Sequence, residues 1–297
     1  MNPESAAMHN IDRNRRSRLE LSPTIKNAHE RATRDVLTNP DYAIQEAEFE
    51  GVYGTSAIAA DKAEVARLER LFAKQDTPEE QNAKKIADVL EAIVLMQSEM
   101  NEWLGSATTL RTSKYDDYIN KVDMLAEWSH PEDGTRVLAL AVDVTFGNAG
   151  VEKKMRAIRD EIDSGSLGKV RYFRDSDNQF MGTRNNVPRT VIGVSQPMVE
   201  ELARLWLAND NKALAKHSVQ RQFLVQIVHQ LTTMRDYAAR IGKDDVVKAY
   251  NQALVIARPL LDSKSIIDRG DYSEDPVAQS IREKTKEFFF SPQKKVS

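Results

Sequence analysis

Cysteine is absent from this chain of 297 residues, which excludes disulfide bridges and thiolate metal sites. No apolar run reaches the ~18 residues needed to cross a bilayer, and the first residues contain no apolar signal-peptide core. The net charge of -3 gives no general basic excess of the kind that indicates nucleic-acid binding, although a local basic patch is compatible with it. These absences predict a soluble, cytoplasmic protein without a membrane segment.

Several sequence patterns of common enzymes are missing as well. The chain has no phosphate-binding loop of the form G-x-x-x-x-G-K-[ST], no G-x-G-x-x-G dinucleotide fingerprint and no G-x-S-x-G nucleophile elbow. A cysteine nucleophile is excluded by composition. Their absence narrows the field of reactions that this chain could catalyse.

The most informative stretch runs from residue 115 to residue 154 and predicts two strands joined by a turn. Residues 122–128 are apolar except for Asp123 and Glu127, and the sequence HPEDG that follows is rich in turn-forming residues. Residues 136–146 form the most hydrophobic run in the chain, with Asp143 in the middle. A lone acid in a buried strand is costly unless something binds it.

Pairing of these strands as a hairpin would bring the two aspartates together. Asp123 would then lie opposite Val142 or Asp143, and strand alternation places both carboxylates on a face lined by alanines. Two carboxylates at that distance repel each other unless a cation or a shared proton lies between them. The sequence therefore predicts an oxygen-ligated Mg²⁺ or Mn²⁺. The alternative is a structural ion pair of Asp143 with Lys121 or a nearby arginine.

The order of a helix, an Asp-bearing strand, a strand with an acid-x-residue pattern, a helix and a strand resembles the core of the PD-(D/E)XK (restriction-endonuclease-like) nuclease superfamily. The resemblance covers about residues 96–207. It implies that Asp123 and Asp143 hold the metal ion. Thr145 stands at the position of the family's lysine, and Lys153 or Lys154 on the next helix would supply that positive charge.

The same family implies a glutamate contributed by the helix that precedes the strands. Helical spacing predicts that helix over residues 79–104, where Glu99 and Glu102 are the available candidates. The alternative is that both are surface acids. Asp116 and Asp117, just before the first core strand, are interpreted as solvated loop acids or as support for the metal ligands.

Beyond the hairpin we expect an edge strand at residues 107–113, a helix at 151–163 and strands at 169–174 and 190–194. The strand–helix–strand order implies parallel pairing with a right-handed crossover. Residues 175–189 are polar and predict a loop. Four arginines bracket that loop and are candidates for contact with a nucleic-acid backbone or are ordinary surface charge: Arg171, Arg174, Arg184 and Arg189.

The expected fold is α/β, with a small mixed sheet of four to five strands flanked by helices and mainly helical N- and C-terminal extensions. Three consecutive phenylalanines at 288–290 predict docking onto the body of the protein or onto a partner. A homo-oligomer, if it forms, would use the C-terminal helices. The expected parts are a disordered basic tail (1–24), a helical region (25–95), the nuclease-like core (96–208), a helical hairpin (209–262) and a charged tail (263–297).

Two functions follow as hypotheses. The first is a Mg²⁺- or Mn²⁺-dependent nuclease that hydrolyses phosphodiester bonds of DNA or RNA, with Asp123, Asp143, Lys153 and Lys154 as catalytic residues. The second is a catalytically inactive nuclease-like fold that serves as a nucleic-acid- or protein-binding scaffold. The threonine at 145 favours the second hypothesis and the retained pair of acids favours the first.

Overall fold

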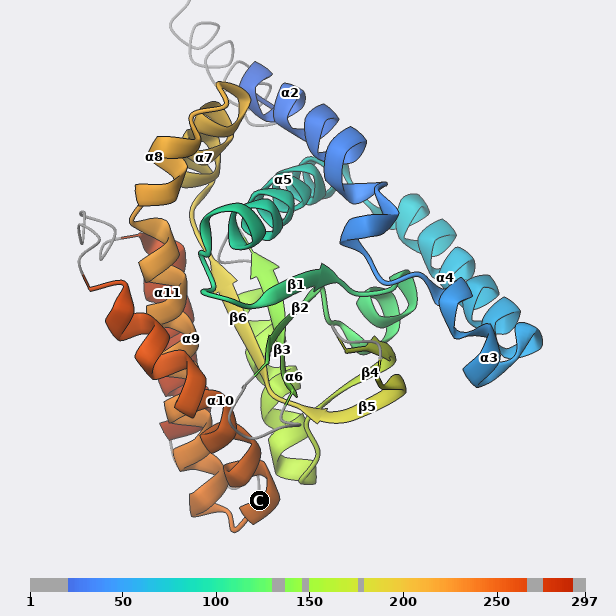
Figure 1. Ribbon diagram of the computed structural model, residues 1–297, viewed down its shortest axis with the longest axis vertical. Coiled ribbons are helices and arrows are strands. Elements are labelled where there is room, and N and C mark those ends of the chain that lie inside the picture. The colour runs from blue at the N-terminus through green and yellow to red at the C-terminus, as the bar shows by residue number, and fades with distance from the viewer. Residues whose placement is uncertain (1–20, 130–136, 146–149, 176–178, 266–274, 291–297) are drawn as a thin grey trace, which may run out of the picture.

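The computed structural model describes residues 21–129, 137–145, 150–175, 179–265 and 275–290; of residues 129 and 137–145 it describes the backbone alone. The architecture is mixed α/β and mostly helical, which confirms the expected class (Figure 1). Among the described helices, none combines the length and apolarity that a bilayer crossing requires. The expected N-terminal tail lies almost wholly outside the described residues.

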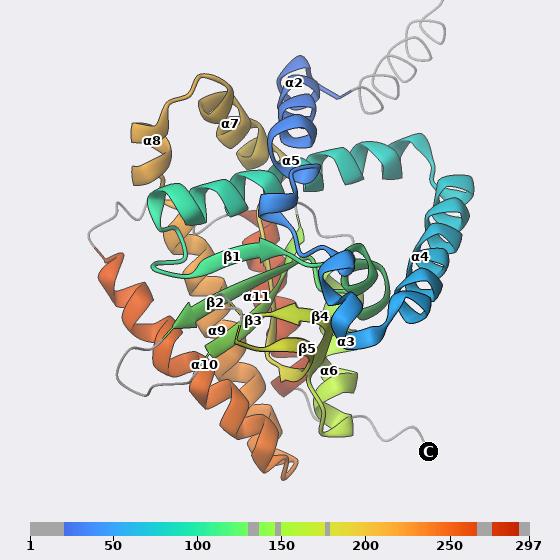
Figure 2. The same ribbon diagram turned by 45° about the vertical axis from the view of Figure 1, so that its right-hand side comes forward.

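The described chain begins with α-helices α2 (Pro23–Ala32), the short α3 (Glu50–Tyr53), α4 (Thr55–Gln75) and α5 (Pro78–Asn101). A capping box between Thr77 and Glu80 and the proline at its first position fix the start of α5. Its end is set by Glu102, which adopts a left-handed conformation with φ 51°. Figure 2 shows α5 lying across the sheet. Helix α4 lies at the right-hand edge of the molecule, between α3 and the start of α5 (Figure 2).

A four-stranded mixed sheet lies at the centre, in the order β1-β2-β3-β6. Its strands are β1 (Thr108–Arg111), β2 (Met124–Ser129), β3 (Val137–Thr145) and β6 (Arg189–Gly193). The pairs β1–β2 and β2–β3 are antiparallel, and β3–β6 is parallel. In the β2–β3 hairpin Met124 pairs with Val142, so the same register continued by one residue sets the backbone of Asp123 opposite Asp143.

The segment between β3 and β6 corrects one expectation about the sheet. Helix α6 (Val151–Ser164) follows β3 as expected, but β4 (Gly168–Arg174), the next strand along the chain, does not join this sheet. It pairs antiparallel with β5 (Met181–Val187), which lies within the segment expected to be a polar loop. The parallel neighbour of β3 is instead β6, which comes later in the chain.

After β6 the described residues form α7 (Gln196–Leu207), α8 (Asn211–Lys216), α9 (Val219–Arg240), α10 (Asp244–Ser263) and α11 (Pro276–Phe290). The expected hairpin of α9 and α10 is present, with Gly242 at φ 71° between them. Helix α11 lies in the segment expected to be a charged tail. Of the phenylalanines at 288–290, Phe289 is fully buried with its ring centroid 5.4 Å from that of Tyr237, whereas Phe290 is 48% exposed. The run therefore docks onto the body of the protein through Phe289.

Helices cover the sheet on several sides and share one large hydrophobic core with it. Helix α5 packs against β1 and β3, whereas α6, α9 and α11 all contact β6. The core includes Leu90 and Ile93 of α5, Met155 of α6 and Ile227 of α9. A second, smaller cluster lies beneath the β4–β5 hairpin and includes Phe49 and Tyr172.

Candidate active site

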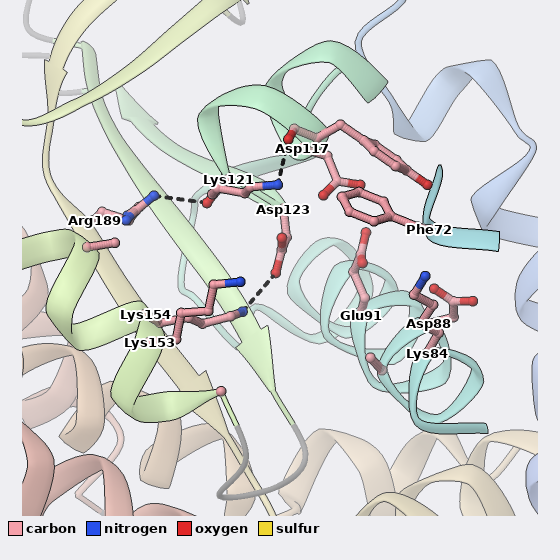
Figure 3. Close-up of a pocket in the computed structure, with 14 residues that line it drawn as sticks. Phe72, Lys84, Asp88, Glu91, Asp117, Lys121, Asp123, Lys153, Lys154 and Arg189 are labelled. Atoms are coloured by element: carbon pink, nitrogen blue, oxygen red, sulfur yellow. Dashed lines mark hydrogen bonds and ion pairs between the residues drawn. The ribbon is translucent and has the colours of Figure 1, made fainter. Parts of the chain in front are cut away.

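A cavity of about 570 Å³ lies where β2 begins, between the end of α4, the middle of α5 and the first turn of α6 (Figure 3). Its volume falls within the range of ~300–1,000 Å³ typical of small-ligand sites. Four acidic side chains line it, and so do four lysines, one arginine and two aromatic rings. These residues are Asp88, Glu91, Asp117, Asp123, Lys84, Lys121, Lys153, Lys154, Arg189, Phe72 and Tyr118.

The four acids come from three different elements. Asp88 and Glu91 are three residues apart on α5 and thus share a face of the helix. Asp117 belongs to the short helical turn Asp116–Asn120, and Asp123 comes directly before β2. Figure 3 shows Asp123 between the lysines of α6 and the acids of α5. The fold thus gathers carboxylates that are up to 35 residues apart in the sequence.

Burial raises the pKa values of three of these four acids, and for two of them the neighbouring acids act in the same direction. Burial raises the pKa of Glu91 to about 7, with the negative charge of Asp123 acting in the same direction and Arg111 against it. Burial, Asp123 and Glu91 together raise the pKa of Asp117 to about 8. Burial also raises the pKa of Asp88, against the hydrogen bond of His29. Such a cluster favours protons or a cation.

Basic side chains contact the cavity acids from two sides, from α6 and from β1. The Nζ atom of Lys154 lies 3.5 Å from a carboxylate oxygen of Asp123, and Lys153 is exposed beside it on α6. On the other side, Arg111 of β1 forms a short ion pair with Glu91 and donates a hydrogen bond of 3.0 Å to the carbonyl of Leu37. Glu91 is therefore held in place by a neighbouring strand.

Asp123, Lys153 and Lys154, all expected from the sequence at one site, do line this cavity. The backbone register brings Asp143 next to Asp123, and the side chain of Asp143 lies outside the described residues, as does that of Thr145. Lys121, the alternative partner of Asp143, donates a hydrogen bond of 2.6 Å to the carbonyl of Tyr118.

Glu99 and Glu102, the acids expected from α5, do not line the cavity. Glu99 accepts hydrogen bonds of 2.7 Å from both the backbone N–H and the hydroxyl of Thr109. Glu102 lies just beyond the end of the helix, where its carbonyl accepts a hydrogen bond from Lys264. The glutamate of α5 that does reach the cavity is Glu91, about two turns earlier.

Three of the four arginines expected to contact nucleic acid are engaged elsewhere. Arg171 forms an ion pair of 2.6 Å with Asp61, and Arg174 lies 3.2 Å from Glu48. Arg184 stacks over Phe173, with 5.8 Å between its guanidinium carbon and the ring centroid. All three belong to the β4–β5 hairpin and none of them lines the cavity.

Arg189 does line the cavity, but as a buried residue that supports it. It is 2% exposed and forms an ion pair of 3.1 Å with Glu161 of α6. It also donates hydrogen bonds to the carbonyls of Asn120 and Lys121, at 3.2 and 3.1 Å. These contacts fix the backbone turn that leads into Asp123, and they correct the expectation that Arg189 contacts a phosphate backbone.

Asp116 and Asp117 are likewise not the solvated loop acids that the sequence suggested. Asp116 is completely buried, and its two oxygens accept hydrogen bonds from the backbone N–H groups of Arg171 and Tyr172, at 2.6 and 2.9 Å. Asp117 is half-buried in the cavity wall. In the sequence, the burial of Asp116 is indicated only by nearby polar residues that donate to its carboxylate, Ser113 at 2.9 Å and Asn120 at 2.5 Å.

The donor set suits a hard cation, since it consists of carboxylate oxygens. Among the described residues, no three acidic or histidine side chains lie close enough together to share one ion. At most two of the described acidic side chains could therefore bind the same ion. No protein-family model, curated protein or solved structure matches this chain.

Proposed function

We propose that this chain is a divergent PD-(D/E)XK-type nuclease that hydrolyses phosphodiester bonds of DNA or RNA with Mg²⁺ or Mn²⁺. The observation that carries the proposal is the meeting of four carboxylates with Lys153 and Lys154 in one cavity at the start of β2. A structural ion-pair network would not need so many buried acids, because burial, and after it the repulsion between them, raises the pKa values of Glu91 and Asp117.

The order of the elements supports the proposal. Helix α5, strands β2 and β3, helix α6 and strand β6 follow one another as the resemblance implies, with β4 and β5 inserted before the last strand. Asp123 comes directly before β2, and the β2–β3 register continued by one residue sets the backbone of Asp143 opposite it. Glu91 of α5 takes the place that the sequence had assigned to Glu99 or Glu102.

In this proposal Asp123, Asp143 and Glu91 would hold the cation. When bound, the ion would lower the pKa of a water molecule and neutralise charge on the scissile phosphate. Lys154 is held close to Asp123 by their ion pair, where it can stabilise the additional negative charge of the transition state. Lys153 is exposed and would attract the phosphate backbone.

The test is cleavage of supercoiled plasmid, single-stranded DNA and single-stranded RNA in Mg²⁺ and in Mn²⁺. We expect cleavage by the unchanged protein and its loss in Asp123→Asn, Asp143→Asn and Glu91→Gln. Glu99→Gln is the matched control, because Glu99 lies on the same helix and outside the cavity. Cleavage that survives all three substitutions would contradict the proposal. Circular dichroism establishes that each variant is folded.

The second candidate function is a nuclease-like fold without cleavage that binds nucleic acid or protein. Thr145 at the position of the family's lysine favours it, because a threonine supplies no positive charge. The same variants separate the two functions. A scaffold would bind without cutting in either metal, and Asp123→Asn would leave its binding unchanged or strengthen it by removing a negative charge.

A further inference from the structure

Two aromatic rings line the same cavity and have no part in the proposed chemistry. Phe72 comes from the last turn of α4, and Tyr118 from the turn that precedes β2. Their ring centroids are 6.0 Å apart, and the ring planes are inclined by 26°, which is a stacked arrangement. Figure 3 shows Phe72 projecting into the cavity towards Asp117 and Glu91.

Hydrophobic packing does not account for this pair. Neither ring belongs to the two clusters of buried hydrophobic residues found in the described part of the chain. Both rings are only partly buried, so the stack has exposed surface on the side of the cavity. Aromatic rings that are partly exposed in a polar, charged cavity are typical of binding surfaces.

Lysines flank the stack. The Nζ atoms of Lys84 and Lys121 lie 5.7 and 5.8 Å from the centroid of Phe72, and both lysines are exposed. Together with Lys153 and Lys154 they place four lysines around a cavity that also contains four carboxylates. Both ammonium groups lie over the ring of Phe72, and as exposed, flexible side chains they can move aside for a base and contact its phosphates. A ring with cations this close matches a nucleotide, whose base has a flat face and whose two flanking phosphates are negative.

We propose that Phe72 and Tyr118 form a stacking subsite for an unpaired base, so that the cavity takes single-stranded nucleic acid or a frayed end rather than intact duplex. The inference rests on the proposed function, since it assumes that the acid–lysine cavity receives a nucleic-acid backbone. A cavity of about 570 Å³ has room for one nucleotide. A base within a duplex would reach Phe72 only after it leaves its stack and its pair.

Binding tests this subsite separately from cleavage. Single-stranded DNA that carries one 2-aminopurine, and the duplex of the same sequence, are titrated with the protein in Ca²⁺. We expect single-stranded DNA to bind at least about tenfold more tightly than duplex, with quenching of 2-aminopurine by the ring. Phe72→Leu should weaken single-strand binding by about 5- to 100-fold, the effect of losing one stacking ring, whereas Phe72→Trp should restore it.

The matched control is Phe180→Leu, because Phe180 is 42% exposed and stands outside the cavity against Phe173. The inference would be overturned if Phe72→Leu and the unchanged protein bound single-stranded DNA equally tightly. It would also be overturned if Phe72→Leu weakened the binding of single strand and duplex equally, or if the unchanged protein bound neither. Thermal unfolding establishes that the variants are folded. If Phe72→Leu does not fold, the test uses Tyr118→Leu, which should also weaken single-strand binding, and the quenching of 2-aminopurine by the unchanged protein. Unchanged binding by Tyr118→Leu together with no quenching would overturn the inference.

The outcomes for the two proposals are distinct. Single-strand binding that depends on Phe72, without cleavage in Mg²⁺ or Mn²⁺, would support the stacking subsite and contradict the nuclease. Cleavage that is indifferent to Phe72, with equal use of single strands and duplex, would support the nuclease and overturn the subsite.

Discussion

The side-chain amide of Gln230 bonds to both backbone groups of Val191, accepting from its N–H at 2.9 Å and donating to its carbonyl at 2.6 Å. Four residues earlier on α9, Gln226 makes the same pair of contacts with Gly193, both at 2.9 Å. Val191 and Gly193 are alternate residues of β6, a strand at the edge of the sheet. The two glutamines lie on one face of α9 and form the hydrogen bonds that a further strand would otherwise make with the backbone groups of Val191 and Gly193.

Gln230→Met is expected to lower the free energy of unfolding by about 2–4 kcal/mol, because two buried backbone groups lose their partners. Gln252→Met on the exposed face of α10 is the matched control and should change stability by less than about 0.5 kcal/mol. Urea denaturation measures both. Equal stability of the two variants would show that water satisfies the edge strand.

Asp116→Asn should be among the most destabilising single-atom changes in the chain. Its two carboxylate oxygens accept from the backbone N–H groups of Arg171 and Tyr172, whereas an asparagine has only one oxygen, so one of these N–H groups would face an NH2 group and lose its acceptor. We expect a loss of about 2–4 kcal/mol in the free energy of unfolding. Asp236→Asn removes an exposed carboxylate paired with Arg235 and should have little effect. Similar denaturation midpoints for the two variants would contradict this role of Asp116.

The acids of the cavity predict a dependence of stability on pH. The folded-state pKa values of Glu91 and Asp117, about 7 and about 8, lie above the ordinary value of ~4 for a carboxyl group. The folded protein therefore retains protons that the unfolded chain releases, and its stability should fall as the pH rises from about 5 through 8. The melting temperature, measured across this range, should decrease more steeply than in Glu91→Gln/Asp117→Asn.

A divalent cation should reverse this loss. At pH 8.5 the addition of Mn²⁺ should raise the melting temperature of the unchanged protein, and chelation should lower it again. The control is Glu64→Gln/Asp236→Asn, which removes two acids on the surface and should respond to Mn²⁺ as the unchanged protein does. A Mn²⁺ effect of equal size in Glu91→Gln/Asp117→Asn would place the binding of the ion elsewhere.

The two lysines of α6 should affect different steps. Lys154 lies beside Asp123, so Lys154→Met should lower kcat by about 100-fold with little change in KM. Lys153 is exposed, so Lys153→Met should raise KM and weaken the salt dependence of binding, with kcat preserved. Lys248→Met on α10 is the control for removal of one positive charge. An identical effect of both lysine variants on kcat and KM would contradict the assignment.

Much of the scaffold around the cavity could be predicted from local patterns. The strand expected at 136–146 is found at Val137–Thr145, and the helix expected at 151–163 at Val151–Ser164. Strand alternation and the turn expected at residues 130–134, which lie outside the described residues, were enough to place Asp123 opposite Val142 or Asp143, and the β2–β3 register sets its backbone opposite Asp143. These predictions succeed because periodicity and turn chemistry act within a few residues.

The features that the sequence patterns did not predict depend on contacts between residues far apart in the sequence. Helix α5 is buried on more than one side, with Gln97 and Ser98 buried along with Ile93 and Leu95, so its pattern could not show which glutamate faces the cavity. Asp116 is buried by a strand 55 residues later. Strand β5 contains three consecutive exposed polar residues and is held in place by backbone pairing with β4.

The last described helix has a bearing on the chemistry as well as on packing. Arg159 of α6 donates a hydrogen bond of 2.6 Å to the carbonyl of Phe288, and Thr285 contacts the sulfur of Met155 at 3.7 Å. Helix α11 is thus fastened to the helix that presents Lys153 and Lys154. A chain that ended before residue 276 would lack α11, so α6 would lose these contacts. The ammonium groups of Lys153 and Lys154 would then be held less firmly in position.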